Sequence, residues 1–170
     1  MKDHANFPQA AASLLKSRPD VHFVLSGQGV DRKTPALSGL VRDRGIAERE
    51  HLLGQRDDMP RLTAALDIAS SSSAFVEGFP NVVGEAMSWG VPCVATDVGD
   101  SAWIVGDQRM VVSPSDPEAL AARWQDVIDK ASEAQKSSIG LNLRERVVHN
   151  FSLDHMIERT IKALRSDSAT

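Results

Sequence analysis

Two glutamates eight positions apart, Glu77 and Glu85, are the residues whose types and spacing most suggest chemistry, and Gly78 and Pro80 lie between them. Pro80 suits the first position of a helix, because its fixed φ is helical and its missing N–H has no role there. The amides of residues 81–84 would then be free donors at the positive end of that helix, where anions bind. Gly78 lets a ligand approach the backbone closely.

The second acid, Glu85, can face the same end of the predicted helix. Glu85 lies about one turn inside the predicted helix, and its side chain leans back toward the N-terminal end. Both carboxylates can therefore face whatever the amides hold. Two such residues, taken alone, are more often a loop acid and a helix-dipole acid. A phosphate held by amides, with carboxylates that accept hydroxyl hydrogen bonds, is the environment of a sugar nucleotide.

Length and composition fit one domain with an ordinary core, which we place at residues 1–165 with a polar tail at 166–170. The chain has 170 residues, 42% of them apolar, and a net charge of −4, so neither nucleic acid nor an anionic membrane is favoured as a partner. No apolar run approaches the roughly 20 residues that span a bilayer, and no secretory signal is visible. The single cysteine, Cys93, lies in an apolar run, which predicts a buried, inert thiol and a cytoplasmic location.

Short apolar segments alternate with helical patterns along the chain. Strands are expected at residues 21–25, 50–53, 67–71, 91–95 and 110–112. Helices are expected at residues 2–16, 34–44, 57–66, 80–89, 101–105, 116–131, 136–149 and 152–164. This alternation predicts an α/β fold, a Rossmann-like parallel sheet of about five strands with helices on both faces. Right-handed crossovers bring the carboxyl ends of all strands, and hence the polar turns that follow them, to the one edge where ligands bind.

Five segments, in order along the chain, carry a resemblance to a known family. They are DIASSS at 67–72, EGFPN at 77–81, EAM at 85–87, GVPCVATDVG at 90–99 and DPEAL at 116–120. Together they resemble the C-terminal, donor-binding domain of the retaining glycosyltransferases with the GT-B fold, the glycosyl transferases group 1. The spacing of Glu77 and Glu85 is similar to the E-x7-E signature of that family.

The resemblance implies a role for each part of the acidic loop, residues 77–80, and of the helix that follows it. The acid that matches Glu77 contacts donor-sugar hydroxyls near the reacting carbon, and the acid that matches Glu85 accepts hydrogen bonds from the ribose. Retention of configuration is usually described there as front-face attack. The backbone segments that would face the sugar and the diphosphate belong to Gly78, Phe79, Pro80, Asn81, Val82 and Val83.

The family also neutralises the departing diphosphate with an arginine and a lysine a few residues apart. Lys2, in KDHANF, resembles the lysine, while the place of the arginine and of a preceding strand falls before residue 1. The resemblance thus makes Lys2 a catalytic residue, although a flexible terminal lysine is the ordinary alternative. No metal or other cofactor is implied, because lysine, arginine and the helix end supply the positive charge. The five histidines also show no zinc spacing.

Three further turns lie at the same predicted edge. Gly27 and Gly29 form part of a tight turn that lacks the third glycine of a dinucleotide fingerprint, so they make a plain turn or border the nucleotide. Gln55 and Arg56 follow a strand where the nucleobase sits in the resembling family, and they are expected to contact it through their backbone. Residues 72–73 are serines that either hydrogen-bond phosphate or make the turn.

The sequence therefore predicts the donor-binding domain of a glycosyltransferase that moves a sugar from a sugar nucleotide to a hydroxyl acceptor. The resemblance implies a role in polysaccharide biosynthesis, where many members of the family act. The acceptor would bind an N-terminal domain that is absent here and that could also contact a membrane peripherally. We expect this chain alone to be inactive or nearly so. The alternatives are a stand-alone nucleotide-sugar binding module or inactive remnant, and a fragment of a sugar-nucleotide epimerase.

Overall fold

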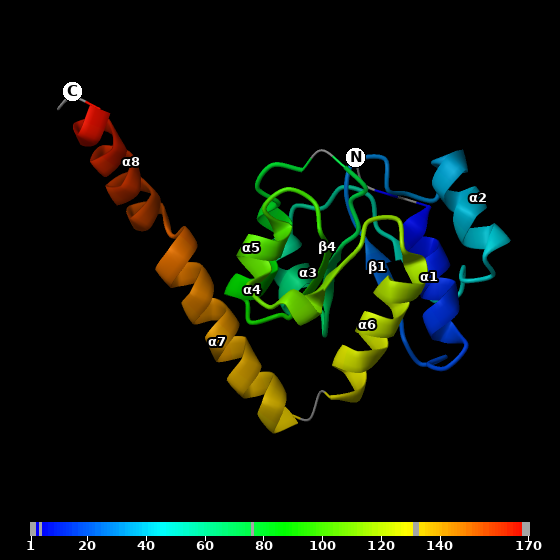
Figure 1. Cartoon of the computed structure of the whole chain (residues 1–170). Coiled ribbons are helices and arrows are strands. Elements are labelled where there is room, and N and C mark those ends of the chain that lie inside the picture. The colour runs from blue at the N-terminus through cyan, green and yellow to red at the C-terminus, as the bar shows by residue number, and fades with distance from the viewer. Residues whose placement is uncertain (1–2, 4, 76, 131–132, 168–170) are drawn as a thin grey trace.

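The computed structural model describes residues 3, 5–75, 77–130 and 133–167, which form an α/β body and a projecting C-terminal arm (Figure 1). The strands are β1 (Phe23–Leu25), β2 (Glu50–Leu52), β3 (Ala69–Ser71), β4 (Cys93–Thr96) and β5 (Val111–Val112). The helices are α1 (Asn6–Leu15), α2 (Pro35–Asp43), α3 (Met59–Ala64), α4 (Asn81–Ser88), α5 (Ser101–Val105), the 3-10 helix η1 (Gln108–Met110), α6 (Pro117–Asp129), α7 (Glu133–Phe151) and α8 (Leu153–Asp167). The predicted alternation of strands and helices is confirmed.

All the strand pairs are parallel, but they form two sheets rather than one. β1 pairs with β2, and β3, β4 and β5 pair in that order. No ladder joins β1 to β3 among the described residues. The predicted five parallel strands are thus confirmed, whereas their expected union in a single sheet is wrong.

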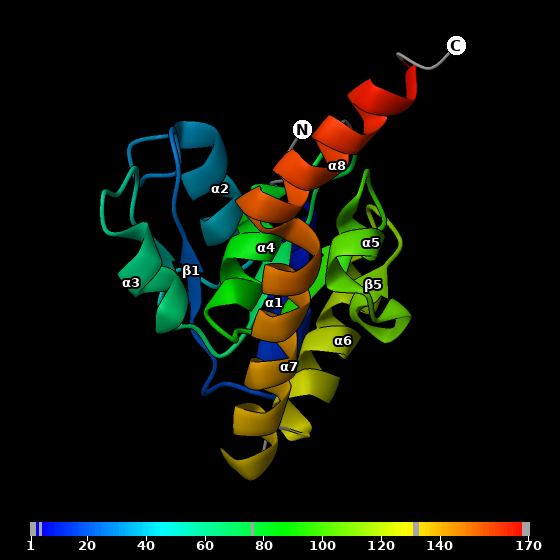
Figure 2. The same cartoon turned by 90° about the vertical axis from the view of Figure 1, so that its left-hand side faces the viewer.

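Helices cover both faces of the strands. β4 shows this best, because Cys93 and Ala95 belong to one apolar cluster and Val94 to another. The first cluster lies under α4, α5 and α7, and the second lies under α1 and α6. Strands buried on both faces are typical of parallel sheets. Figure 2 shows the outermost layer, with α7 in front of α4.

One tryptophan of α6 connects the two sheets. The ring of Trp124 packs at 5.7 Å from the ring of Phe23 in β1 and at 5.0 Å from the ring of Phe7. Its indole N–H donates a hydrogen bond of 3.2 Å to Ser70 Oγ in β3. Although β1 and β3 are unpaired, they therefore share one core.

The last two helices differ in how they are held. α7 lies along α4, and their backbones approach so closely that a Cβ on Gly90 would be 3.1 Å from Gly140 Cα. Ser152 caps α8, as predicted, by accepting a hydrogen bond of 3.3 Å from the amide of His155. α8 then projects from the body (Figure 1), extends past the predicted end at residue 164, and leaves a row of apolar side chains exposed. None of the helices in the described part of the chain could cross a bilayer.

Candidate functional site

The carboxylate of Glu77 is positioned by buried polar groups of the three-stranded sheet. Its carboxylate Oε1 accepts a hydrogen bond of 2.5 Å from Ser73 Oγ, and the backbone carbonyl of Ser73 accepts one of 2.6 Å from Thr96 Oγ1 in β4. Ser73 and Thr96 are both buried. The hydroxyl of Ser73 is thus bonded to the acid, a contact that neither of the two roles expected from the sequence, phosphate binding or turn formation, included.

The loop after β4 fixes the backbone of the acidic loop. The amide of Asp100 donates a hydrogen bond of 3.1 Å to the carbonyl of Gly78. Gly99 has a φ of +57°, and a Cβ at this position would overlap the carbonyl of Glu77. The sequence grouped both loops at one edge of the sheet, and the structure brings them into contact.

The helix that follows begins at Asn81, one residue later than predicted, with Pro80 as its N-cap at φ −74° and ψ 90°. Pro80 lies outside the helix because its extended ψ turns the chain, while its carbonyl accepts a hydrogen bond of 3.0 Å from the amide of Val83. No side chain caps this end. The amides of Asn81 and Val82 have no hydrogen-bond partner in the described part of the chain, so the tip of α4 keeps these two of the free donors predicted at residues 81–84. The prediction is wrong for Val83, because its amide donates to Pro80.

Glu85 lies on the exposed side of α4. Asn81, Val82 and Glu85 are all exposed, whereas Val83 and Ala86 are buried. Since residues three and four apart share a helix face, Glu85 lies behind the two free amides, as predicted. The helix therefore presents its positive end and one acid on the same side.

The two glycine turns expected at this edge are bonded to each other. The carbonyl of Gly54 accepts hydrogen bonds from the Gly27 amide at 2.9 Å and from Ser26 Oγ at 2.7 Å, and the Gly54 amide donates to Val30 at 2.6 Å. Gly29, with a φ of +73°, is exposed in the same turn. The exits of β1 and β2 therefore form one unit.

Gln55 and Arg56 are exposed beside this unit. The guanidinium of Arg56 forms two hydrogen bonds with Asp58, at 2.8 and 2.7 Å, which hold the pKa of that carboxyl below its ordinary value. The side chain of Arg56 is thus already paired. The backbone contact of Arg56 with a nucleobase stays a prediction.

Lys2 lies outside the described residues, but the chain next to it is anchored. Asp3 accepts hydrogen bonds from the amide of Asn6, at 3.1 Å, and from Ser115 Oγ, at 3.0 Å. Ser115 follows β5, so the start of the chain lies near the exit of that strand. This anchor was not predicted from the sequence, although an aspartate whose carboxylate accepts a hydrogen bond from the amide three residues later is an ordinary capping arrangement.

Cys93 is buried, and burial raises the pKa of its thiol to about 12, which confirms the predicted inert cysteine. Phe79 in the acidic loop and Trp103 in α5 are partly exposed, and both rings contact Phe151 at the end of α7. The role of Phe151 was not foreseen. In the described residues, no group of three acids, histidines or cysteines could hold a metal ion.

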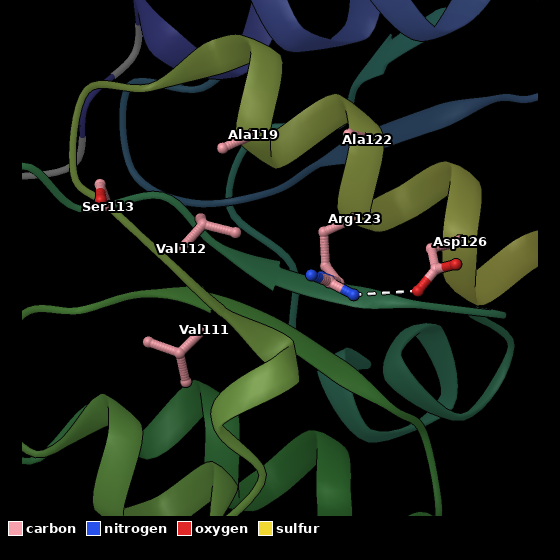
Figure 3. A pocket seen from close by; sticks show the side chains of 7 residues that line it. All are labelled: Val111, Val112, Ser113, Ala119, Ala122, Arg123 and Asp126. Atoms are coloured by element: carbon pink, nitrogen blue, oxygen red, sulfur yellow. Dashed lines mark hydrogen bonds and ion pairs between the residues drawn. The ribbon is translucent and has the colours of Figure 1, made fainter.

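A shallow depression lies between β5 and α6, away from the acidic loop (Figure 3). Its lining consists of Val111, Val112, Ser113, Ala119, Ala122, Arg123 and Asp126. Arg123 and Asp126 point toward one another and form an ion pair of 2.9 Å. Lys130 and Arg123 hold the pKa of Asp126 below its ordinary value, so the charges here compensate each other. None of the predicted donor residues lines it.

Comparisons with known proteins agree with this geometry. Over 170 residues, the chain is 25% identical to the UDP-Gal:alpha-D-GlcNAc-diphosphoundecaprenol alpha-1,3-galactosyltransferase of Escherichia coli, covering 98% of this chain and 42% of that protein. It is 30% identical to the lipopolysaccharide core biosynthesis mannosyltransferase LpsB of Rhizobium meliloti, over 87% of this chain and 43% of that one. The crystal structure of Anabaena Alr3699/HepE in complex with UDP matches 97% of this chain and 45% of its own, with a TM-score of 0.83 and 26% identity.

The chain thus spans less than half the length of these three relatives. A family match covers residues 1–130, and therefore includes the acidic loop, the glycine turns and the strand exits described above. The likeness to HepE supports the predicted Rossmann-like α/β fold. The chain belongs to the family of glycosyl transferases group 1.

Proposed function

We propose that this chain is the donor-binding half of a retaining glycosyltransferase of the GT-B fold, which moves a sugar from a sugar nucleotide to a hydroxyl acceptor. The observation that carries the proposal is the tip of α4, where the free amides of Asn81 and Val82 lie beside a held acid, Glu77. A helix end with free donors attracts a diphosphate. A carboxylate fixed next to it accepts hydrogen bonds from sugar hydroxyls.

In this proposal the protein contributes orientation and charge. The amides and the dipole of α4 stabilise the negative charge that develops on the departing diphosphate, and Lys2 adds a full positive charge. Glu77 positions the sugar, and Glu85 accepts hydrogen bonds from the ribose. Gly27, Gly29, Gln55 and Arg56 border the nucleobase. Such preorganisation requires no metal ion.

The relatives indicate which donor to test first. HepE was crystallised with UDP, and the relative from Escherichia coli carries UDP-Gal in its name. These names favour a UDP-sugar as donor and envelope polysaccharide assembly as the setting. We place the protein in the cytoplasm, in keeping with the buried thiol of Cys93.

Three observations support an arrangement in two halves. The chain covers 42–45% of the three relatives, the facing strands β1 and β3 are unpaired, and α8 exposes an apolar row. We infer that the complete enzyme has an acceptor-binding domain and a further strand between β1 and β3. A transfer assay with a full-length relative as reference tests this. The 170-residue chain should show little or no turnover, and comparable turnover would contradict the proposal.

Calorimetric titration of the chain with UDP-, GDP- and ADP-sugars, in the presence of a chelator, tests donor binding. We expect one nucleotide series to bind, and Glu85→Ala to weaken it about tenfold, because a charge-assisted hydrogen bond is lost. The matched control is Glu158→Ala, an exposed acid of α8. If no series binds, or if Glu85→Ala binds like the control, the proposed site is wrong.

A further inference from the structure

Phe79, in the acidic loop, is one of three aromatic rings that pack edge to face. Its ring lies 5.6 Å from that of Phe151 and 6.4 Å from that of Trp103, while Trp103 and Phe151 are 4.8 Å apart. The interplanar angles lie between 64° and 85°. Edge-to-face pairs stabilise beyond the area that they bury. The three rings therefore join the acidic loop to α5 and to the end of α7.

The position of Phe151 follows from the way α7 lies along α4. The two helices run antiparallel, with Gly140 against Gly90 beyond the C-terminal end of α4 and Phe151 against Phe79 just before its N-terminal end. α7 is also tied to α5, because the Arg146 guanidinium donates hydrogen bonds to the carbonyls at the end of α5 and lies 6.0 Å from the ring of Phe151. The end of α7 is thus anchored independently of the acidic loop.

The acidic loop is therefore restrained from two directions. The loop after β4 holds its carbonyls, through the amide of Asp100 and the close approach of Gly99. The ring of Phe151 holds the side chain of Phe79, which is 43% exposed and so has few other contacts. The amides of Asn81 and Val82 come directly after this doubly restrained segment.

We propose that Phe151 is a positioning residue for the donor site, which fixes the backbone of residues 78–82 by holding the ring of Phe79. The effect of Phe151 on donor binding rests on the proposed function. The restraint of the loop by Phe151 does not.

Hydrogen exchange in the chain without ligand tests the restraint of the loop. Phe151→Ala should raise exchange about tenfold at the amides of Val83 and Asp100, which donate hydrogen bonds to the carbonyls of Pro80 and Gly78, because two edge-to-face contacts are lost. Exchange in β4 should be unchanged. Phe151→Tyr keeps the ring and should restore the protection. Leu153→Ala, an exposed truncation two residues later, is the matched control. Exchange at the amides of Val83 and Asp100 equal to that of the control would overturn the proposal.

Two further measurements keep the result decisive. If Phe151→Ala does not fold, Phe79→Leu removes the same ring contact from the side of the loop, and unchanged exchange at the amides of Val83 and Asp100 would again overturn the proposal. In titrations with UDP-glucose, Phe151→Ala should weaken binding several-fold, while amide exchange in β4 stays as in the wild-type chain. Equal affinity of the two chains would contradict a positioning role of Phe151 in donor binding. If the wild-type chain binds no sugar nucleotide, the proposed function fails, while the exchange data still decide whether Phe151 positions the loop.

Discussion

The two sheets of this molecule hold their polar groups in different ways. In the three-stranded sheet, the buried hydroxyl of Thr96 donates a hydrogen bond to the backbone carbonyl of Ser73, and the buried hydroxyl of Ser73 donates one to the carboxylate of Glu77. In the two-stranded sheet, the carboxylate of Glu50 is 2% exposed and has no hydrogen-bond partner among the described residues. One sheet therefore uses buried polar groups to place an acid at its edge, whereas the other carries an acid in its interior.

This difference indicates that the three-stranded side is rigid around Glu77 and that the two-stranded side is destabilised by Glu50. A satisfied buried network fixes one geometry, while an unpaired buried carboxyl costs stability whenever it is ionised. Burial accordingly raises the pKa of Glu50 to about 7. The proposed donor-sugar contact lies on the three-stranded side, and we expect the stability of the two-stranded side to depend on pH.

The largest loss of stability should come from a substitution of Gly99, on the three-stranded side. In Gly99→Ala, the new Cβ overlaps the carbonyl of Glu77 at a φ of +57°, so the two loops must separate. We expect a loss of about 4 kcal/mol in the free energy of unfolding, measured by urea denaturation, together with loss of donor binding.

The control for this change is Gly84→Ala in α4, where a Cβ would meet open space. It should be neutral or gain up to about 1 kcal/mol, because alanine favours helix. A Gly99→Ala chain as stable as the control would show that the loops are not pressed together.

On the two-stranded side, Glu50→Gln should stabilise the protein at high pH. The Glu50 carboxyl has a pKa of about 7 in the folded chain and an ordinary value of 4.5, so both states are protonated below pH 4.5. As the pH rises from 4.5 to 7, the unfolded chain loses its proton first and folding becomes less favourable. We expect the variant to gain about 3 kcal/mol at pH 8 and almost nothing at pH 4.5, by urea denaturation.

Glu48→Gln, an exposed acid two residues earlier, provides the comparison. Its effect should be small at every pH. A Glu50→Gln gain that does not change between pH 4.5 and 8 would mean that the Glu50 carboxyl is not held neutral by burial.

A smaller effect is expected where α7 supports the three-stranded side. Arg146→Met removes two hydrogen bonds to the last carbonyls of α5, those of Trp103 and Ile104, but keeps an apolar side chain. The free energy of unfolding should fall by about 2 kcal/mol. Arg144→Met, at an exposed position of the same helix, should change little, and equal losses in the two variants would refute a specific role for Arg146.

The smallest effect concerns the link between the two sheets. Trp124 donates its indole N–H to Ser70 Oγ, at 3.2 Å. A double-mutant cycle with Trp124→Phe and Ser70→Ala should give a coupling energy of about 1 kcal/mol in thermal or urea unfolding. A coupling near zero would leave apolar packing as the connection between the sheets.

Local signals in the sequence predicted much of this structure. The parallel α/β order followed from apolar segments between helical patterns, and the start of α6 followed from Asp116, whose carboxylate accepts a hydrogen bond of 2.9 Å from the amide of Ala119. The place of the acidic loop at the carboxyl ends of the strands also followed from chain order. Each of these features depends on neighbours in sequence or on general rules of topology.

The rest depends on contacts between distant segments. The inward turn of Ser73 requires Thr96 from another strand, and the contact of Phe79 with Phe151 requires α7 to lie along α4. Glu50 could not be foreseen as buried, because a charged side chain usually favours an exposed position. The gap between β1 and β3 likewise appears only when the strands are placed in space.

The most direct test of the account is a backbone amide NMR titration of the 15N-labelled chain with a UDP-sugar. If the tip of α4 holds the diphosphate, the largest shifts should fall on the amides of residues 78–82, with smaller ones at the glycine turns near Gly27 and Gly54, and Glu85→Ala should reduce them all. Saturable shifts centred elsewhere, such as the depression between β5 and α6, or no shifts at millimolar donor, would contradict it.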